Sequence, residues 1–159
     1  MRYFDQCESP HGPMILVATE RGLAGVYFSG QKHMPERDGW QPAPDNVHIR
    51  DARRQVAEYF AGRRRRFELA LDPQGTDFQQ SVWQAIASVN YGETISYGEL
   101  ARRAGAPGSA RAAGAATGRN PIGIVVPCHR IVGASGALTG YAGGLAMKRA
   151  LLALEGVST

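Results

Sequence analysis

The sequence predicts an α+β fold. A small N-terminal antiparallel sheet with one helix is followed by a mainly helical C-terminal part that contains a helix-turn-helix and Cys128. Two patterns favour this fold. Short apolar segments separated by tight turns fill residues 1 to 29, whereas helical spacing with capping residues prevails from residue 76 onward. With 159 residues, 43% of them hydrophobic, the chain can bury a core.

Three strands are expected at the N-terminus. They are RYFDQC, MILVATE and LAGVYFS, and the turns SPHGP and Arg21-Gly22 separate them. The following stretch from Gly30 to Asn46 has several prolines and little periodicity, which predicts a long, mobile surface loop.

A helix is expected from about Ile49, because apolar residues recur at helical spacing until Gly62. Four arginines, 63 to 66, follow it. The alternation of Phe67, Leu69 and Leu71 then predicts a half-buried strand. We place the domain boundary at Pro73-Gln74-Gly75, which gives an N-terminal α/β domain over residues 1–72 and a C-terminal domain over residues 73–159.

The C-terminal domain opens with a helix, because Thr76 and Gln79 have the spacing of a capping box before an apolar-periodic run. A short helix from Tyr97 to Ala104, a turn over residues 105–108 and a third helix from Ser109 as N-cap to about Gly118 form a helix-turn-helix candidate. A short buried strand over residues 122–126 and a last helix over residues 145–154 complete the prediction.

Charge and cysteine content narrow the function classes. Eighteen Lys and Arg against fourteen Asp and Glu give a net charge of +4, which favours an anionic partner but is common in proteins that never bind nucleic acid. No segment reaches the roughly 20 apolar residues of a membrane span, and the N-terminus lacks a secretory signal. We therefore expect a cytoplasmic protein with no membrane partner, in which Cys7 and Cys128 are free thiols.

The segment from Asn120 to Ile131 carries the chemistry. Cys128 follows an apolar run and precedes His129, and a basic neighbour increases the thiolate fraction of a nucleophilic cysteine. The same two residues also fit a buried structural cysteine beside a surface histidine, and taken alone they favour that reading.

Pro127-Cys128-His129-Arg130-Ile131 resembles the active-site pentapeptide of the O6-alkylguanine-DNA alkyltransferases, also called methylated-DNA-protein-cysteine methyltransferases. The likeness covers the C-terminal half in the family's order, whereas the N-terminal half is similar in layout only, where the family has a ribonuclease H-like domain. The matching segments are Thr76 to Gln79 with Val82-Trp83, Ile95 to Ala101, Ala110 to Gly114, Asn120-Pro121, Gly140 to Leu145, and Lys148 to Glu155.

The resemblance implies direct-reversal DNA repair. Cys128 would take the alkyl group of O6-methylguanine, with O4-methylthymine as a further substrate, irreversibly and once per molecule. His129 would act as base through a water and be held by Glu155, whereas Asn120 would brace the turn before the cysteine. The resemblance implies no cofactor.

Substrate contacts are also implied by the resemblance. The Tyr97 hydroxyl would donate to guanine N3, the carbonyls of Cys128 and Ile131 would accept from the exocyclic amine, and the N–H of Ala142 would donate to O6. Tyr141, beside Ala142 in the same motif, is also expected to contact the substrate. Ala142 stands where many relatives have serine, which keeps the main-chain donor and removes any hydroxyl contact.

Double-stranded DNA containing O6-alkylguanine is the implied partner, with no obligate protein partner. The cysteine cannot approach the alkyl carbon in line while the base is stacked in the duplex, so the nucleotide must be flipped out. The third helix, from Ser109 to about Gly118, consists mostly of small residues. In the family this helix enters the minor groove, and the residue at Arg111 fills the gap that the flipped base leaves in the base stack. The expected DNA contacts are Ser109, Ala110, Arg111, Ala112, Gly114 and Arg119.

The N-terminal half has one candidate DNA contact, which the sequence does not settle, and one candidate metal site, which the sequence does not support. Arg63, Arg64, Arg65 and Arg66 could extend a DNA footprint, although such a run is more often a solvated face. Some relatives bind zinc in this half, but Cys7 with the histidines at 11, 33 and 48 has no convincing ligand spacing, so we expect no metal.

Two rival functions remain at this point. The helix-turn-helix and basic charge also fit a non-enzymatic DNA-binding module, although damage-binding relatives lack the cysteine. Cys128, His129 and Glu155 also fit a cysteine hydrolase, in which the Arg111 helix would have no purpose.

Overall fold

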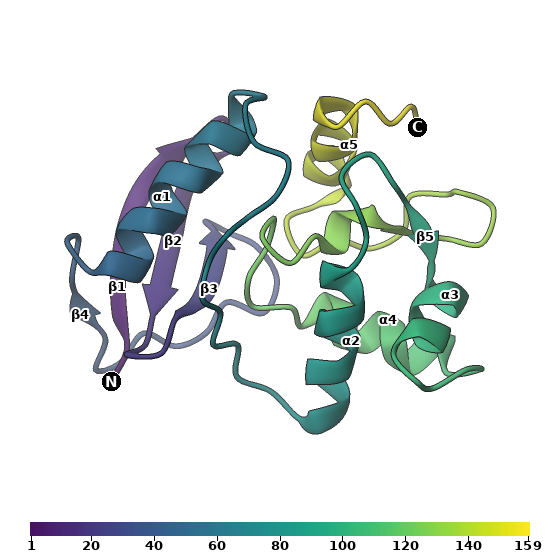
Figure 1. Cartoon of the computed structure of the whole chain (residues 1–159), viewed down its shortest axis with the longest axis horizontal. Helices are drawn as coiled ribbons and strands as arrows, with labels where there is room; N and C mark the ends of the chain where they lie inside the picture. The colour runs from purple at the N-terminus through teal and green to yellow at the C-terminus, as the bar shows by residue number, and fades with distance from the viewer. The chain divides into compact units, whose positions relative to one another are not determined.

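The computed structural model describes all residues from Met1 to Thr159. The chain forms two compact units, and its elements confirm the α+β class (Figure 1). Unit 1 comprises Met1–Gln74 with Pro121–Val125, and unit 2 comprises Gly75–Asn120 with Val126–Thr159. No helix of the chain combines the length and apolar character that crossing a membrane requires.

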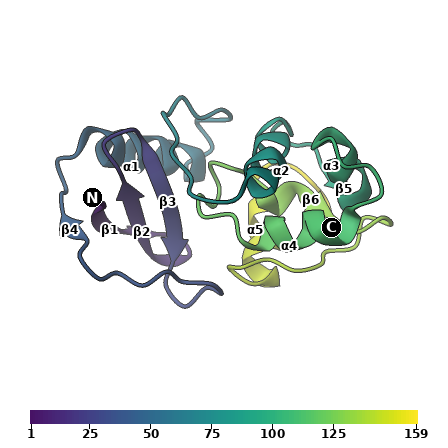
Figure 2. The same cartoon turned by 90° about the horizontal axis from the view of Figure 1, so that it is seen from below.

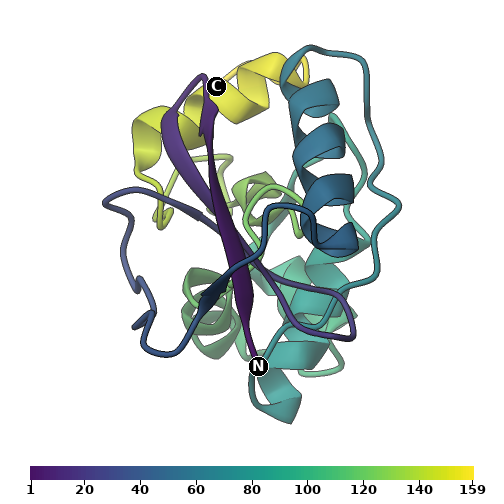
Figure 3. The ribbon, with the colours of Figure 1, turned by 90° about the vertical axis from the view of Figure 1, so that its left-hand side faces the viewer.

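Unit 1 contains a four-stranded sheet of order β3-β2-β1-β4 (Figure 2). The three expected strands are confirmed as β1 (Tyr3–Ser9), β2 (Gly12–Ala18) and β3 (Leu23–Phe28), which pair antiparallel. Strand β4 (Gln41–Pro42) pairs parallel with the start of β1 (Figure 3). The prediction of loop throughout residues 30 to 46 is therefore wrong at β4, because the N–H groups on either side of Pro42 donate to carbonyls of the N-terminal strand region.

Helix α1 (Val47–Phe60) packs on β1, β2 and β3, as the ribbon shows (Figure 1). It begins two residues before the predicted start, because the Asn46 side chain accepts from the N–H groups of His48 and Ile49 and caps the helix. Its apolar face and the continuous apolar run of β2 form the core of unit 1. The buried residues of α1 are Ile49, Ala52, Gln55, Val56 and Tyr59.

The predicted strand at Phe67, Leu69 and Leu71 is wrong. Only Leu71 forms an isolated bridge, with Leu23, although the segment runs beside β3. The buried Gln55 side chain bonds both main-chain groups of Glu68 and so takes the place of a strand partner. Gly22 permits the close approach, because a Cβ there would lie 2.6 Å from the Ala70 carbonyl oxygen.

Unit 2 confirms the predicted helices. They are α2 (Asp77–Ala87), α3 (Tyr97–Arg103), α4 (Ala110–Gly118) and α5 (Leu145–Leu154). Thr76 and Gln79 form the expected capping box. Ser109 is the N-cap residue of α4 as predicted, but its φ of −101° and ψ of 41° are not extended and its side chain makes no capping hydrogen bond. Helices α2, α3 and α4 pack against one another.

The strand predicted over residues 122–126 is also wrong. Ile122 makes an isolated bridge with Val26, and the chain then turns through Ile124, whose φ is 70°. The segment is buried but irregular, because it leaves unit 2 at Pro121, pairs briefly inside unit 1 and returns at Val126. Unit 2 also contains two short parallel strands that were not predicted from the sequence. They are β5 (Ile95–Ser96) and β6 (Ile131–Val132).

Candidate active site

Cys128 begins the one-turn 3₁₀ helix η1 (Cys128–Arg130), directly after the segment that returns to unit 2. Its N–H donates to the Val126 carbonyl at 2.8 Å, and its carbonyl accepts from the N–H of Ile131. The tight turn places a buried thiol beside β6 and α5, rather than at the end of a strand as the sequence predicted. Both cysteines of the chain are free thiols.

The surroundings of the Cys128 thiol act on its pKa in opposite directions. Burial raises this pKa, whereas a hydrogen bond with the Asn120 side chain and the positive charge of Lys148 lower it. The Asn120 amide also donates to the Val126 carbonyl at 2.8 Å. Asn120 thus joins the end of α4 to the turn that carries the cysteine.

His129 is wholly buried and its Nε2 lies 2.7 Å from Oε2 of Glu155, at the end of α5. Burial lowers the pKa of His129, which the hydrogen bond and charge of Glu155 only partly oppose, so the ring is neutral at pH 7. A neutral ring that donates from Nε2 has its lone pair on Nδ1. That atom is buried and has no hydrogen-bond partner.

Arg130 completes the network around Glu155. Its Nε donates to Oε1 at 2.8 Å and its Nη2 to Oε2 at 3.1 Å, while Nη1 donates to the Val89 carbonyl at 2.7 Å. The N–H of Gly92 adds a further bond to Oε1 at 3.2 Å. This bidentate pair fixes the carboxylate that orients His129 and compensates its buried charge. The sequence reasoning assigned Arg130 no role, because an arginine in a motif carries no signal for burial.

Tyr97, the first residue of α3, donates its hydroxyl to the Thr139 carbonyl at 3.3 Å. Burial raises the pKa of this hydroxyl, so it is a proton donor at neutral pH. Gly114 of α4 lies under the ring, where an added Cβ would come 3.5 Å from Cδ1 of Tyr97. A small residue at this point of α4 therefore lets the tyrosine ring lie against the helix.

The Thr139 carbonyl also accepts from Lys148, whose Nζ donates to the carbonyls of Ile131 and Gly140 as well. Lys148 lies on α5 and is wholly buried. Tyr141 and Ala142 follow in the same loop and are half-buried. Sequence reasoning mentioned Lys148 only as part of a motif, since lysines are exposed by default.

Helices α3 and α4 lie side by side and form the expected helix-turn-helix (Figures 1 and 2). One side of α4 is buried, at Ala113, Ala116 and Thr117. The Trp83 indole donates to the Ala116 carbonyl on this helix at 2.9 Å. The opposite side is exposed at Arg111. Of the other predicted DNA contacts, Ala112 and Arg119 are exposed, and Ser109, Ala110 and Gly114 are half-buried.

Other basic residues singled out in the sequence are partly engaged. Glu99 binds both Arg102 and Arg103 on α3. In unit 1, Arg64 pairs with Glu58, and the arginines at 63, 65 and 66 are exposed. No group of three His, Cys, Asp or Glu side chains is placed to hold a metal ion.

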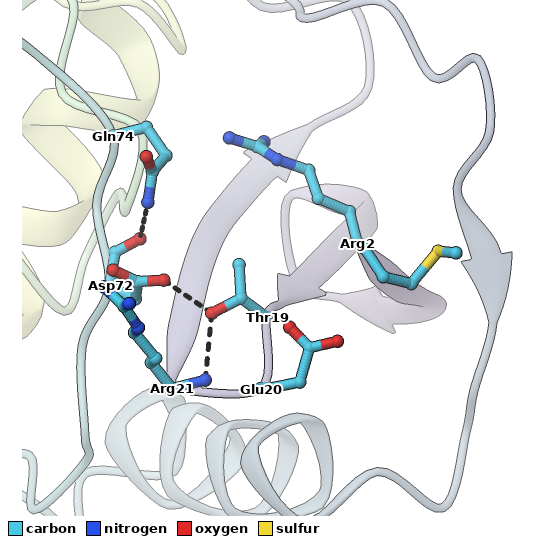
Figure 4. Close-up of a pocket in the computed structure, with 7 residues that line it drawn as sticks. Arg2, Thr19, Glu20, Arg21, Asp72 and Gln74 are labelled. Atoms are coloured by element: carbon cyan, nitrogen blue, oxygen red, sulfur yellow. Dashed lines mark hydrogen bonds between the residues drawn. The ribbon is translucent and has the colours of Figure 1, made fainter.

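Unit 1 has an open pocket of about 390 Å³, shown in Figure 4. One of its carboxylates, Asp72, serves the fold, since it accepts from the Thr19 hydroxyl, which in turn accepts from the N–H of Arg21. Arg2 extends into the pocket from the opposite wall. Charges of both signs line it and it contains no nucleophile beside a base, so we assign it no chemistry.

Comparison with known proteins gives a consistent result over nearly the whole chain. Residues 77–157 match the family model described as 6-O-methylguanine DNA methyltransferase, DNA binding domain. Residues 3–73 match the model described as 6-O-methylguanine DNA methyltransferase, ribonuclease-like domain.

Individual relatives agree with the family models. A methylated-DNA–protein-cysteine methyltransferase of Methanosarcina acetivorans is 48% identical over 155 residues, which cover 97% of this chain and 98% of the relative. The protein of the same name from Mycobacterium leprae is 51% identical over 148 residues, 93% of this chain and 88% of the relative. The crystal structure of Mycobacterium tuberculosis OGT in complex with DNA has a TM-score of 0.89 and 48% identity, covering 96% of this chain and 92% of that one.

Proposed function

Because the chain belongs to the 6-O-methylguanine DNA methyltransferase family, we propose that it repairs DNA by moving an alkyl group from O6 of guanine to its own Cys128. One observation carries the proposal. A buried thiol is bonded to Asn120 and adjoins a neutral histidine that Glu155 orients, all within unit 2. This is the arrangement of nucleophile, base and orienting acid that covalent catalysis requires.

The transfer is an in-line displacement. The Cys128 sulfur forms a bond to the alkyl carbon while the bond from that carbon to O6 breaks, and the electron pair passes to the guanine oxygen. His129 receives the thiol proton at Nδ1 through a bridging water, and Glu155 stabilises the imidazolium that results. Burial keeps His129 neutral beforehand, so Nδ1 is free to accept.

Guanine is a poor leaving group unless its developing negative charge is stabilised. The Tyr97 hydroxyl donates to N3 and the N–H of Ala142 donates to O6, while the carbonyls of Cys128 and Ile131 accept from the exocyclic amine. Tyr97 must exchange its bond to the Thr139 carbonyl for one to the base. Tyr141, which precedes Ala142 in the same loop, supplies a further contact to the base.

Access to the base requires flipping, because the sulfur cannot approach the alkyl carbon in line within a stacked duplex. The exposed side of α4 enters the minor groove, which is about 6 Å wide and admits only small side chains. Arg111 fills the gap in the stack. The remaining contacts to the duplex come from Ser109, Ala110, Ala112, Gly114 and Arg119.

The product is a thioether on Cys128, which neither water nor thiol exchange cleaves, so each molecule reacts once. The protein needs no cofactor and no obligate protein partner for this reaction. A cytoplasmic location accords with the free state of both cysteines, since reducing compartments keep thiols unpaired.

The proposal is tested by incubating the protein with duplex DNA that contains O6-methylguanine and then measuring protein and DNA by mass spectrometry. We expect the protein to gain one methyl group while the lesion becomes guanine. A binding module would leave both masses unchanged, and a hydrolase would repair the lesion without a lasting change in the protein. Either of those results would contradict the proposal.

A further inference from the structure

Lys148 has an unusual environment for a lysine. Its side chain is wholly buried, and its ammonium donates to three carbonyl oxygens, at 2.6 Å to Ile131, 2.8 Å to Thr139 and 3.2 Å to Gly140. None of the ion pairs of the chain includes it. The hydrogen-bond partners that offset the cost of burying this charge are therefore all carbonyl groups.

The carbonyls that Lys148 binds lie on both sides of one loop. Ile131 immediately follows η1, whereas Thr139 and Gly140 precede Tyr141 and Ala142. A bond from Gly133 N–H to the Ala137 carbonyl at 2.8 Å closes the loop between them. The ammonium thus joins the two sides of the loop to α5.

Two of these carbonyls belong to the proposed recognition of guanine. Ile131 offers its carbonyl to the exocyclic amine, and a carbonyl oxygen has a second lone pair for that bond. Thr139 is the present acceptor of the Tyr97 hydroxyl. Lys148 therefore contacts one carbonyl that is proposed to read the base and another that holds the Tyr97 hydroxyl before the base arrives.

Burial lowers the pKa of Lys148 to about 8, and the nearby Cys128 raises it. An apolar side chain such as methionine would fill the same space without the cost of a buried charge. Retaining an ammonium here is explained if its three donor hydrogens hold the loop in a shape that a neutral, apolar residue cannot maintain.

We propose that Lys148 is a positioning residue for base recognition, which holds the Ile131 carbonyl where the flipped guanine meets it and fixes the loop at Thr139 and Gly140 that leads to Tyr141 and Ala142. The inference rests on the proposed function, because its readout is alkyl transfer. Positioning can be distinguished from an effect of Lys148 on the ionisation of Cys128, because a change in ionisation would alter every reaction of Cys128 equally.

The test compares Lys148→Met with Arg149→Met, a matched change on the exposed side of α5, both in a Cys7→Ser background so that Cys128 is the only thiol. Two rates are measured for each protein: methyl transfer from duplex O6-methylguanine and alkylation of Cys128 by iodoacetamide, which needs no base recognition. Circular dichroism monitors folding.

For Lys148→Met we expect the ratio of transfer rate to iodoacetamide rate to fall by about tenfold or more. Loss of the Lys148 charge also raises the pKa of Cys128, but this slows both reactions equally and cancels in the ratio. Arg149→Met should change neither rate. Transfer within about threefold of the parent, or equal losses in both reactions, would overturn the inference. Absence of transfer in the parent protein would instead contradict the proposed function.

If Lys148→Met does not fold, the parent protein gives the answer. From about pH 7 to about pH 9 the ratio of transfer rate to iodoacetamide rate should fall by about threefold or more, because the neutral amine has one donor fewer. Both rates depend equally on the ionisation of Cys128, so this dependence cancels in their ratio. His129 has a lowered pKa, and Tyr97 and Tyr141 have raised ones, so none of these three changes charge in this range. A flat ratio would overturn the inference.

Discussion

The two units differ in what they bury. In unit 1 the buried side chains are apolar except for Gln55, and the ion pair of Arg53 with Asp5 remains partly exposed. In unit 2 the core around Cys128 contains charged and polar groups with low exposure. They are Thr117, Asn120, His129, Arg130, Lys148 and Glu155. A core built only for stability avoids such groups, because their desolvation offsets what their pairing contributes.

The cysteines repeat this contrast. Cys7 lies half-buried on β1 of unit 1, and burial raises the pKa of its thiol, with the charge of Arg53 as a partial offset. Cys128 is buried in unit 2 with Asn120, His129 and Lys148 around it. Burial alone makes a thiol inert, so reactivity depends on these neighbours.

The largest expected effect is the loss of the nucleophile. Cys128→Ser should abolish methyl transfer while leaving DNA binding largely intact, because a neutral hydroxyl is a far weaker nucleophile than a thiolate. Cys7→Ser should leave transfer unchanged. Transfer is measured with duplex O6-methylguanine and binding by titration of the same duplex. Residual transfer by Cys128→Ser within about tenfold of the parent would contradict the assignment.

The next prediction compares one arginine from each unit. Arg130→Met leaves Glu155 buried without its ion-pair partner and should lower the free energy of unfolding by about 3 to 5 kcal/mol. Arg53→Met removes a partly exposed pair and should cost no more than about 1 kcal/mol. Urea unfolding measures both. Equal losses would mean that the buried network of unit 2 has no special weight.

Arg111→Ala should slow repair of duplex O6-methylguanine by roughly one to two orders of magnitude, because filling the gap left by a flipped base is worth about 1 to 3 kcal/mol. Transfer from free O6-benzylguanine needs no flipping and should be spared, provided that the pocket admits the benzyl group. Both substrates are compared at low and high salt. Equal losses on both would count against an intercalating role, and a loss that shrinks at low salt would indicate a phosphate contact.

The smallest effect is a pH dependence of stability. Because burial lowers the pKa of His129, the unfolded chain binds a proton there that the folded chain does not, below the ordinary value of 6.5. The stability that the neutral ring contributes is present above that value and is lost as the pH falls, by at most about 1.4 kcal/mol per pH unit. Urea unfolding of the parent and His129→Gln, from about pH 7 to about pH 5, isolates this term. Identical slopes would contradict it.

Helices with terminal signals could be predicted from the sequence. Thr76 and Gln79 give α2 its capping box, and the glycine pair at 143 and 144 precedes α5 as expected. Alternation alone was misleading over residues 67–71, because Gln55 supplied the main-chain bonds that a strand needs. Strands β5 and β6 have two residues each, too few for any period, and form through tertiary pairing.

The residues of the candidate site also divide into those that could be predicted from the sequence and those that could not. The motif around Cys128 indicated where chemistry would lie, and the family likeness named His129 and Glu155, which the structure brings within 2.7 Å. Neither source indicated that Arg130 and Lys148 would be buried. Long cationic side chains are exposed by default, and only the packing of α5 against η1 makes their burial evident.

The most direct test of the account is a titration of the protein with increasing duplex O6-methylguanine, followed by peptide mapping of the methylated chain. We predict that methyl transfer reaches a plateau at one group per molecule and that the group lies on Cys128 in unit 2, with none on Cys7 in unit 1. Continued turnover beyond one equivalent, or a methyl group on any other residue, would contradict the account.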